Sequence, residues 1–152
     1  MATKATERTA AYAFKMQSPY LSNGRINIDL ARTETLTLSL KTNAEGGENA
    51  VHAHQDEDHA FIILEGEVTF SDELGNETKC HKYEGFMIPK GAYYRYLNTG
   101  SENLIMLRVG ADLSHEGGHT RLRPDGEDIP AHSVENHHVD PVAVPNKFWG
   151  AE

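Results

Sequence analysis

The chain has 152 residues, enough to build one domain with a sizeable core without the help of disulfides. Its 14 Lys and Arg against 23 Asp and Glu give a formal charge of −9, which argues against nucleic acids and anionic membranes as partners, since both attract clustered positive charge. Its one cysteine, Cys80, cannot form a disulfide within the chain, and no signal-peptide core or apolar run of the ~20 residues that span a membrane is evident. We therefore expect a cytoplasmic globular protein that binds neither nucleic acid nor membrane.

Strand patterns follow a short polar start. Residues 1–18 are polar and rich in Ala and Thr, which predicts an N-terminal arm outside the folded domain. Residues 33–42 (TETLTLSLKT) alternate polar and apolar residues with period two, which is typical of a half-buried strand. Residues 60–83 predict an apolar strand, a break at Glu65–Glu67, a second strand, and a hairpin whose turn is Gly75-Asn76, since both residues tolerate a positive φ.

The next part of the chain continues in the same way. Residues 84–111 predict three more short strands, separated by turns at Pro89–Gly91 and Asn98–Gly100. No segment has the apolar period of a convincing amphipathic helix. Many short strands that end in turn residues indicate an all-β sandwich or small barrel, which we assign to residues 19–112.

Residues 113–152 form a different kind of segment, rich in His and Pro and ending in the apolar pair Phe148-Trp149. Two large aromatic side chains are unfavourable in water, so we expect this extended segment to dock on the barrel or on a partner subunit. Pro141 and Pro145 favour an extended arm, and aromatic anchors are common in interfaces. We therefore expect the arm to cross to the second subunit of a homodimer; the alternative is an arm that folds back over its own barrel.

Residues 51–70 (VHAHQDEDHAFIILEGEVTF) contain three closely spaced histidines. Imidazole is the commonest protein ligand for transition metals. His52 and His54 share one face of a strand, and the polar turn 55–58 is long enough to return the chain antiparallel and place His59 opposite them. The spacing therefore predicts a metal site. The alternative is a set of solvated histidines. We expect the acidic residues Asp56, Glu57 and Asp58 to be solvated; the alternative is that one of them accepts a hydrogen bond from a ligand imidazole and fixes its tautomer.

Two stretches resemble the two sequence motifs of the cupin superfamily. The first motif, G-x5-H-x-H-x(3,4)-E-x6-G, is matched by Gly46, His52, His54 and Gly66. The second motif, G-x5-P-x-G-x2-H-x3-N, is matched by Pro89, Gly91 and Asn98. The resemblance covers about residues 30–110. It implies a double-stranded β-helix, or jelly-roll barrel, whose mouth holds one divalent metal.

The sequence departs from the family pattern at three positions. His59 stands in the place of the first motif's glutamate, Tyr94 in the place of the second motif's histidine, and Tyr83 in the place of its leading glycine. Carried over position by position, the family's four ligands become His52, His54, His59 and Tyr94. Because a phenol must lose its proton to bind a metal strongly, Tyr94 is open to three roles: metal ligand, acid in the pocket, or core aromatic.

The same strands predict the lining of a substrate pocket. If His59 faces inward, Phe61 and Ile63 follow it on the same face, and Tyr96 shares a face with Tyr94. We expect Phe61, Ile63 and Tyr96 to line a mostly apolar pocket for a small organic molecule. Arg108 is either an anion anchor in this pocket or simply the edge of its strand face. Tyr94 and Tyr96 are the candidate catalytic acid or base groups.

The expected ligands limit the metal and the chemistry. Nitrogen ligands suit transition metals rather than Ca or Mg, and three histidines leave coordination positions open for catalysis. We expect one divalent metal per chain, with Fe(II) favoured and Zn, Ni, Mn or Cu as alternatives. The leading hypothesis is an O2-dependent dioxygenase that cleaves a C–C bond of an enol, diketone or phenol. The alternatives are a Lewis-acid lyase, isomerase or cyclase, and a non-catalytic cupin that binds a small molecule.

Overall fold

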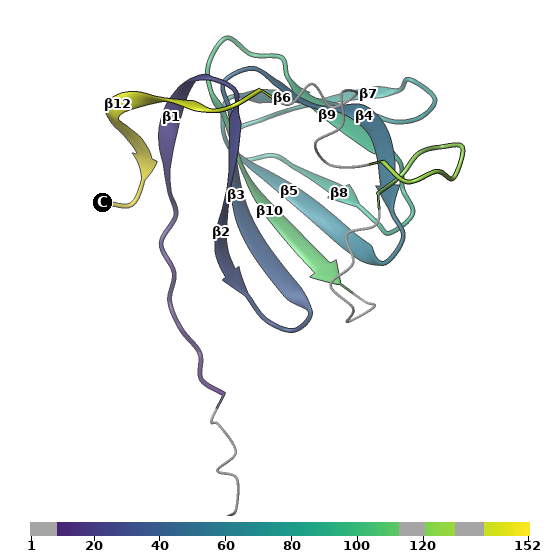
Figure 1. Cartoon of the computed structure of the whole chain (residues 1–152), viewed down its shortest axis with the longest axis horizontal. Coiled ribbons are helices and arrows are strands. Elements are labelled where there is room, and N and C mark those ends of the chain that lie inside the picture. The colour runs from purple at the N-terminus through teal and green to yellow at the C-terminus, as the bar shows by residue number, and fades with distance from the viewer. Residues whose placement is uncertain (1–8, 113–120, 130–138) are drawn as a thin grey trace, which may run out of the picture.

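A computed structural model describes residues 9–112, 121–129 and 139–152. All regular elements in these residues are β-strands, which confirms the predicted all-β class. Two five-stranded antiparallel sheets face each other, and a two-stranded ribbon lies beside them (Figure 1). The first sheet contains, in spatial order, β2 (Arg25–Arg32), β3 (Leu36–Asn43), β10 (Leu104–Asp112), β5 (Glu57–Glu65) and β8 (Gly85–Ile88). The second contains β11 (Arg121–Leu122), β4 (Gly46–His54), β9 (Tyr94–Asn98), β6 (Glu67–Ser71) and β7 (Glu77–His81).

The predicted hairpin is present between β6 and β7. Gly75 has a φ of 84°, a left-handed conformation that glycine adopts without a steric penalty. The Asp72 carboxylate accepts hydrogen bonds from the backbone N–H and the side-chain amide of Asn76, at 2.9 and 2.8 Å. The turn residues named from the sequence therefore close this hairpin.

The turn between β4 and β5 acts differently from the expectation. We predicted that it would return the chain so that the two strands lie antiparallel beside each other. Instead, β4 pairs with β9 and β11, whereas β5 pairs with β10 and β8 in the facing sheet. The turn thus carries the chain from one sheet to the other, and residues at its two ends meet across the sandwich.

A compact apolar core fills one part of the space between the sheets. It includes the completely buried Phe61 and Ile63 from β5, Val68 and Phe70 from β6, and Tyr96 from β9. The aromatic rings of this core pack closely; the centroids of Phe61 and Phe70, for example, lie 5.6 Å apart. This packing fixes the inward faces of β5 and β9, the strands that continue from the core into the candidate site.

In a simple two-layer sandwich the apolar face of a strand points into the space between the sheets. In β3 it points outward. Leu40 is fully buried and shares a face with Thr42, whose hydroxyl lies 2.6 Å from that of Ser18 on β1 (Gln17–Asn23). The apolar face of β3 is therefore the outer one, which β1 covers. Ser39 and Lys41 occupy the opposite, polar face, which looks into the sandwich.

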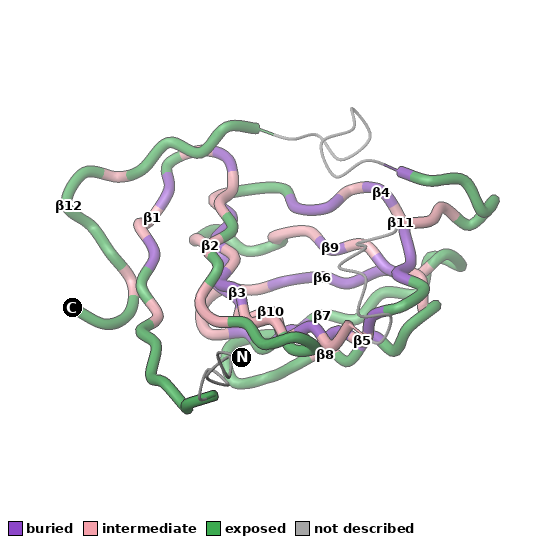
Figure 2. Tube along the Cα trace, turned by 60° about the horizontal axis from the view of Figure 1, so that its bottom comes forward, coloured by how far each residue is buried: buried purple, intermediate pink, exposed green. Residues whose placement is uncertain are grey.

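The C-terminal strand β12 (Val142–Gly150) pairs with β1 of the same chain, and together they form the ribbon beside the barrel. Trp149 is half-buried there, whereas 59% of Phe148 is exposed. Figure 2 shows that much of β12 and the chain leading into β1 are exposed. The rest of the predicted tail, at 113–120 and 130–138, lies outside the described residues, and so does the start of the predicted N-terminal arm. In the part of the chain that is described, no helix is long and apolar enough to cross a membrane.

Candidate metal centre

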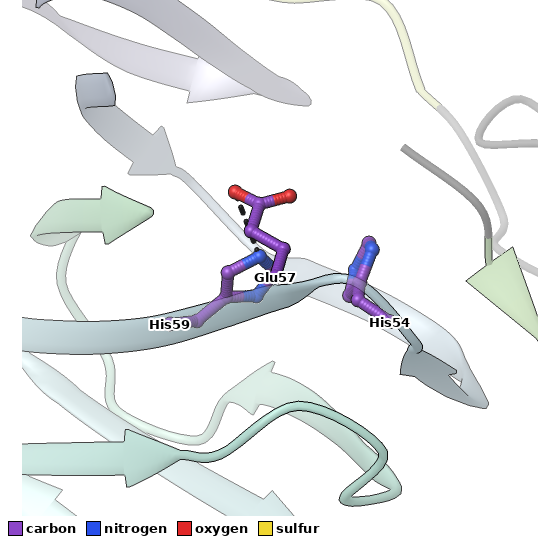
Figure 3. Close-up of side chains that lie close together, drawn as sticks. All are labelled: His54, Glu57 and His59. Carbon is purple, nitrogen blue, oxygen red and sulfur yellow. Dashed lines mark ion pairs between the residues drawn. The ribbon is translucent and has the colours of Figure 1, made fainter. Parts of the chain in front are cut away.

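Three potential metal ligands meet where β4 ends and β5 begins. His54 is the last residue of β4, and Glu57 and His59 share one face of β5 (Figure 3). Each of the three offers a ligand atom within 4.8 Å of the others, and all three side chains are buried. The rings of His54 and His59 are 4.4 Å apart, centroid to centroid. The crossing between the sheets therefore brings two of the predicted ligands together with a glutamate.

His52 lies beside this group, and its protonation state is fixed by the backbone. Its Nδ1 is 2.8 Å from the carbonyl oxygen of Ala50, which can only accept, so Nδ1 carries the hydrogen. The Nε2 atom of the neutral ring therefore presents a lone pair. Such a backbone contact is the usual support for a metal-binding histidine. The ring centroids of His52 and His54 are 5.1 Å apart.

Several buried atoms around these rings have no hydrogen-bond partner in the described part of the chain: His52 Nε2, His54 Nδ1 and Glu48 Oε2. His52 Nε2 lies 3.4 Å from Glu48 Oε2, so a lone pair faces a carboxylate oxygen. Buried polar atoms are rarely left without a partner. A bound cation would satisfy the nitrogens and screen the carboxylate, so the residues present fit a divalent metal.

The three histidines are kept neutral, the form that binds metals. Burial lowers the pKa of His52 and His59, although the carboxylates of Glu48 and Glu57 act in the opposite direction. Burial and, after it, the neighbouring histidines His59 and His52 lower the pKa of His54 to about 2. A site of neutral imidazoles binds a cation without first releasing protons.

Arg108 on β10 contacts the two members of this group that lie on β5. Its Nη2 atom lies 3.1 Å from Glu57 Oε1 and 2.6 Å from His59 Nε2, and these two atoms are 2.9 Å apart. His59 Nε2 therefore lies within hydrogen-bond distance of a guanidinium, which can only donate, and of a carboxylate, which can only accept. Gly110 leaves room for this arrangement, since a Cβ at that position would collide with the Glu57 carboxylate. Arg108 therefore balances Glu57 and contacts a predicted ligand nitrogen.

A cavity of about 480 Å³ opens beside the histidines. His54, Tyr94, Tyr96 and Arg108 contribute to its wall, together with the polar face of β3 and the facing side of β2. Phe61 and Ile63, which we expected in the lining, belong to the core instead. Charged and polar residues are more numerous than apolar ones in the lining, whereas we expected a mostly apolar pocket.

Comparison with known proteins identifies the scaffold. A family model described as a cupin domain matches residues 40–110. The chain belongs to the cupin superfamily. No curated protein matches the sequence.

Solved cupin structures share the fold at low sequence identity. The cupin domain of Cnp3 from Schizosaccharomyces pombe has a TM-score of 0.56 at 19% identity and covers 69% of this chain and 92% of that one. A double-stranded β-helix protein from Klebsiella pneumoniae has a TM-score of 0.55 at 19% identity, with 62% and 82% covered. A cupin superfamily protein from Desulfitobacterium hafniense has a TM-score of 0.52 at 19% identity, with 59% and 79% covered. These likenesses establish the double-stranded β-helix and carry no information on activity.

Within this cupin, the two unusual motif residues lie next to the two ordinary ones. His59 takes the place of the motif glutamate and lies against His54. Tyr94 takes the place of the motif histidine; it is opposite His52 in the β4–β9 register, and its ring centroid is 4.6 Å from that of His52. Burial raises the pKa of Tyr94 well above its usual 10, and Glu48 raises it further, so the side chain is a protonated phenol.

Two carboxylates of this site differ from the sequence-based expectation. Glu57 was expected either to be solvated with the rest of its turn or to accept a hydrogen bond from a ligand imidazole, and it is only 3% exposed. Its position two residues before His59, on the same strand face, is the signal that could have identified it. Glu48 is also buried. Burial opposes its ionisation, yet Lys41 and Arg121 hold the pKa of this carboxyl well below its usual range. Glu48 is therefore anionic, and both carboxylates are paired with basic side chains.

Proposed function

We propose that this cupin is a mononuclear metal-dependent enzyme acting on a small oxygenated organic molecule, and that it is an O2-dependent dioxygenase that cleaves a C–C bond of an enol, diketone or phenol. His52, His54 and His59 would hold the metal, with Fe(II) favoured over Zn, Ni, Mn and Cu. The observation that carries the proposal is the buried, unpartnered Nε2 of His52, whose tautomer is set by Ala50.

Iron(II), when bound, supplies Lewis acidity toward an enol or ketone oxygen and the one-electron chemistry that dioxygen requires. The chain's own residues perform the remaining tasks. The Tyr94 phenol, kept protonated by burial, can donate a hydrogen bond to a substrate oxygen in the cavity. Arg108 supplies a fixed positive charge beside His59. The apolar core behind Tyr96 keeps water from the inner end of the site.

One specific observation favours a second candidate, a Lewis-acid lyase, isomerase or cyclase. Such reactions need a group that gives or takes a proton next to the metal. Tyr94 is such a group, because its ring lies 4.6 Å from that of His52 and its phenol keeps its proton at neutral pH. In this candidate Tyr94 is the general acid, and Tyr96 is the second tyrosine that reaches the cavity.

Metal analysis followed by an oxygen-consumption screen distinguishes these candidates. Protein produced without a His-tag is analysed for bound metals and then tested with enols, diketones and phenols, with and without O2. Iron together with substrate-dependent O2 uptake is the expected result. Zinc or nickel with activity in the absence of O2 would replace the dioxygenase by the second candidate. A protein that binds no metal would be a non-catalytic binding cupin, and the proposal would be wrong.

We also propose a homodimer located in the cytoplasm. The support for a dimer is the ribbon of β1 and β12, which stands beside the barrel and leaves Val142 and Phe148 more than half exposed. Exposed apolar side chains on an extended ribbon are suited to contact with a second copy.

A further inference from the structure

We infer that the cavity selects an anionic substrate, a small molecule with a carboxylate group that binds at the end of the cavity formed by Arg25 and Lys41. This inference rests on the proposed function, because it names the substrate class of the same site. It is supported by the excess of basic side chains in the cavity wall and by the protein groups that these side chains already contact.

The polar wall of the cavity follows from the strand faces. On β2, Arg25 and Asp29 share one face, and on β3, Ser39 and Lys41 do. Since β1 covers the outer face of β3, this polar face remains turned toward the cavity. The inward faces of β2 and β3 therefore make this wall polar along its length, rather than apolar with a few charges.

Positive charge exceeds negative charge around the cavity. Among the described residues, five basic side chains line it, against the two carboxylates of Asp29 and Glu48. Glu57, which balances Arg108, adds a third carboxylate and leaves an excess of positive charge. The whole chain carries −9, so this cavity is a local positive region on an acidic protein. A concave region of one sign attracts small ligands of the opposite sign.

Two of the basic lining residues, Arg25 and Arg32, form no ion pair with a described carboxylate, and Arg25 is the less exposed of the two. Lys41 and Arg121 both contact Glu48 Oε1, at 3.2 and 3.3 Å. Arg25 instead donates to the backbone carbonyl oxygen of Gly47, and no described carboxylate forms an ion pair with it. Its guanidinium has five N–H donors, so it retains donors for an anionic oxygen pair.

The strand register places Arg25 at a distance from the candidate metal group. Arg108 is opposite Ser39 on β3, whereas Arg25 is opposite Asn43 at the other end of the same strand. Four residues of strand span about 13 Å. The long side chains of Arg25 and Arg108 make the distance between their guanidinium groups shorter than this. A molecule with an oxygen at the histidine end and a carboxylate a few bonds away fits this spacing.

Calorimetric titration of the full-length protein with succinate, glutarate and adipate tests the inference, with their neutral diamides and inorganic phosphate as comparison ligands. We expect at least one dicarboxylate to bind at least ten times more tightly than its diamide and than phosphate. Arg25→Gln should weaken that binding about tenfold or more, because a charge-assisted contact is lost. Arg25→Lys should restore part of it. Arg95→Gln is the matched control, since Arg95 lies on β9 outside the cavity lining and should leave binding unchanged.

Titrating metal-loaded and chelator-stripped protein separates this inference from the proposed function. Dicarboxylate binding that persists without metal and depends on Arg25 supports the anion site, even if the protein proves to hold no metal and the proposed enzyme is wrong. The inference would be overturned if the diamides bound equally well, if phosphate bound more tightly, if Arg95→Gln had an equal effect, or if no dicarboxylate bound. Binding that requires the metal and ignores Arg25→Gln would also overturn it, because the anion would then lie on the metal. Unfolding curves of each variant verify that it is folded.

Discussion

Replacing Glu57 by Gln keeps the size of the side chain and removes its charge, so it separates two ways of building the metal site. In one, His52, His54 and His59 hold the metal and Glu57 only balances Arg108. In the other, Glu57 is itself a ligand together with His54 and His59, the three residues whose ligand atoms lie closest together. We favour the first, because His52 Nε2 is buried without a hydrogen-bond partner among the described residues, whereas Arg108 contacts Glu57 and His59 alike.

The structure sets the size of the expected effects. The side chains of Arg108 and Glu57 are 13% and 3% exposed, so their ion pair is largely buried. Removing one partner of a buried pair costs about 3–5 kcal/mol. Gln retains a hydrogen bond to Arg108 worth about 1–3 kcal/mol, so we expect a loss of about 2 kcal/mol. For a chain of this length that lowers Tm by about 4–8 °C. Metal affinity should fall about 10–100-fold, as for other groups that orient a ligand.

The assays are denaturant unfolding of the metal-free protein and competition for metal against a chelator of known affinity. Arg108→Met and the double variant complete a cycle that isolates the interaction of the pair from its other contacts. Complete loss of metal from Glu57→Gln, equal to the loss in His54→Ala, would place Glu57 in the coordination sphere and refute the first arrangement. Unchanged stability and unchanged metal affinity would refute any role of the Glu57–Arg108 pair in the fold or in the metal site.

Three further predictions concern Tyr94, pH and the ribbon. Tyr94→Phe should retain the metal and lower turnover about 10²–10⁴-fold, measured by steady-state kinetics. A phenolate–iron(III) absorption band that disappears in Tyr94→Phe would show that Tyr94 is a ligand instead. Since the pKa of His54 falls from 6.5 to about 2 on folding, the unfolded chain takes up a proton that the folded chain does not. Metal-free protein should thus lose up to about 1.4 kcal/mol per pH unit from this residue as pH falls below about 6, seen by denaturant unfolding, and His54→Gln should flatten the curve. Deleting residues 141–152 removes β12 and should convert the proposed dimer to a monomer in light scattering; a truncated protein that stays dimeric with its metal intact would contradict the role of the ribbon.

Local patterns predicted the parts of the fold that depend on neighbouring residues. The period-two alternation of residues 33–42 identified most of β3, and Gly75-Asn76 identified the β6–β7 turn. The i, i+2 spacing placed His52 and His54 on one face of β4, where both are buried. In each case the information lies within a few residues of the chain.

Features that depend on distant partners could not be predicted in this way. Whether Leu40 or Lys41 faces the cavity is decided by β1, which covers the outer face of β3. The alternation alone fits both choices, so the charged cavity was missed. Glu57 has the sequence environment of a solvated turn, and only the strand crossing and Arg108 on β10 make it a buried partner. The pairing of β12 with β1 joins two ends of the chain and has no local pattern.

The metal content of single-histidine variants tests the central claim most directly. Wild-type protein, His52→Ala, His54→Ala, His59→Ala and the control His81→Ala are purified without a tag, loaded with Fe(II), desalted and analysed for metal. His81 is the matched control because its side chain is 57% exposed and contacts only surface carboxylates. We expect about one metal per chain in the wild type and in His81→Ala, and loss of most of it in the other three, because two neutral ligands hold a divalent ion far less well than three. Full occupancy in His52→Ala or His59→Ala would contradict the three-histidine site.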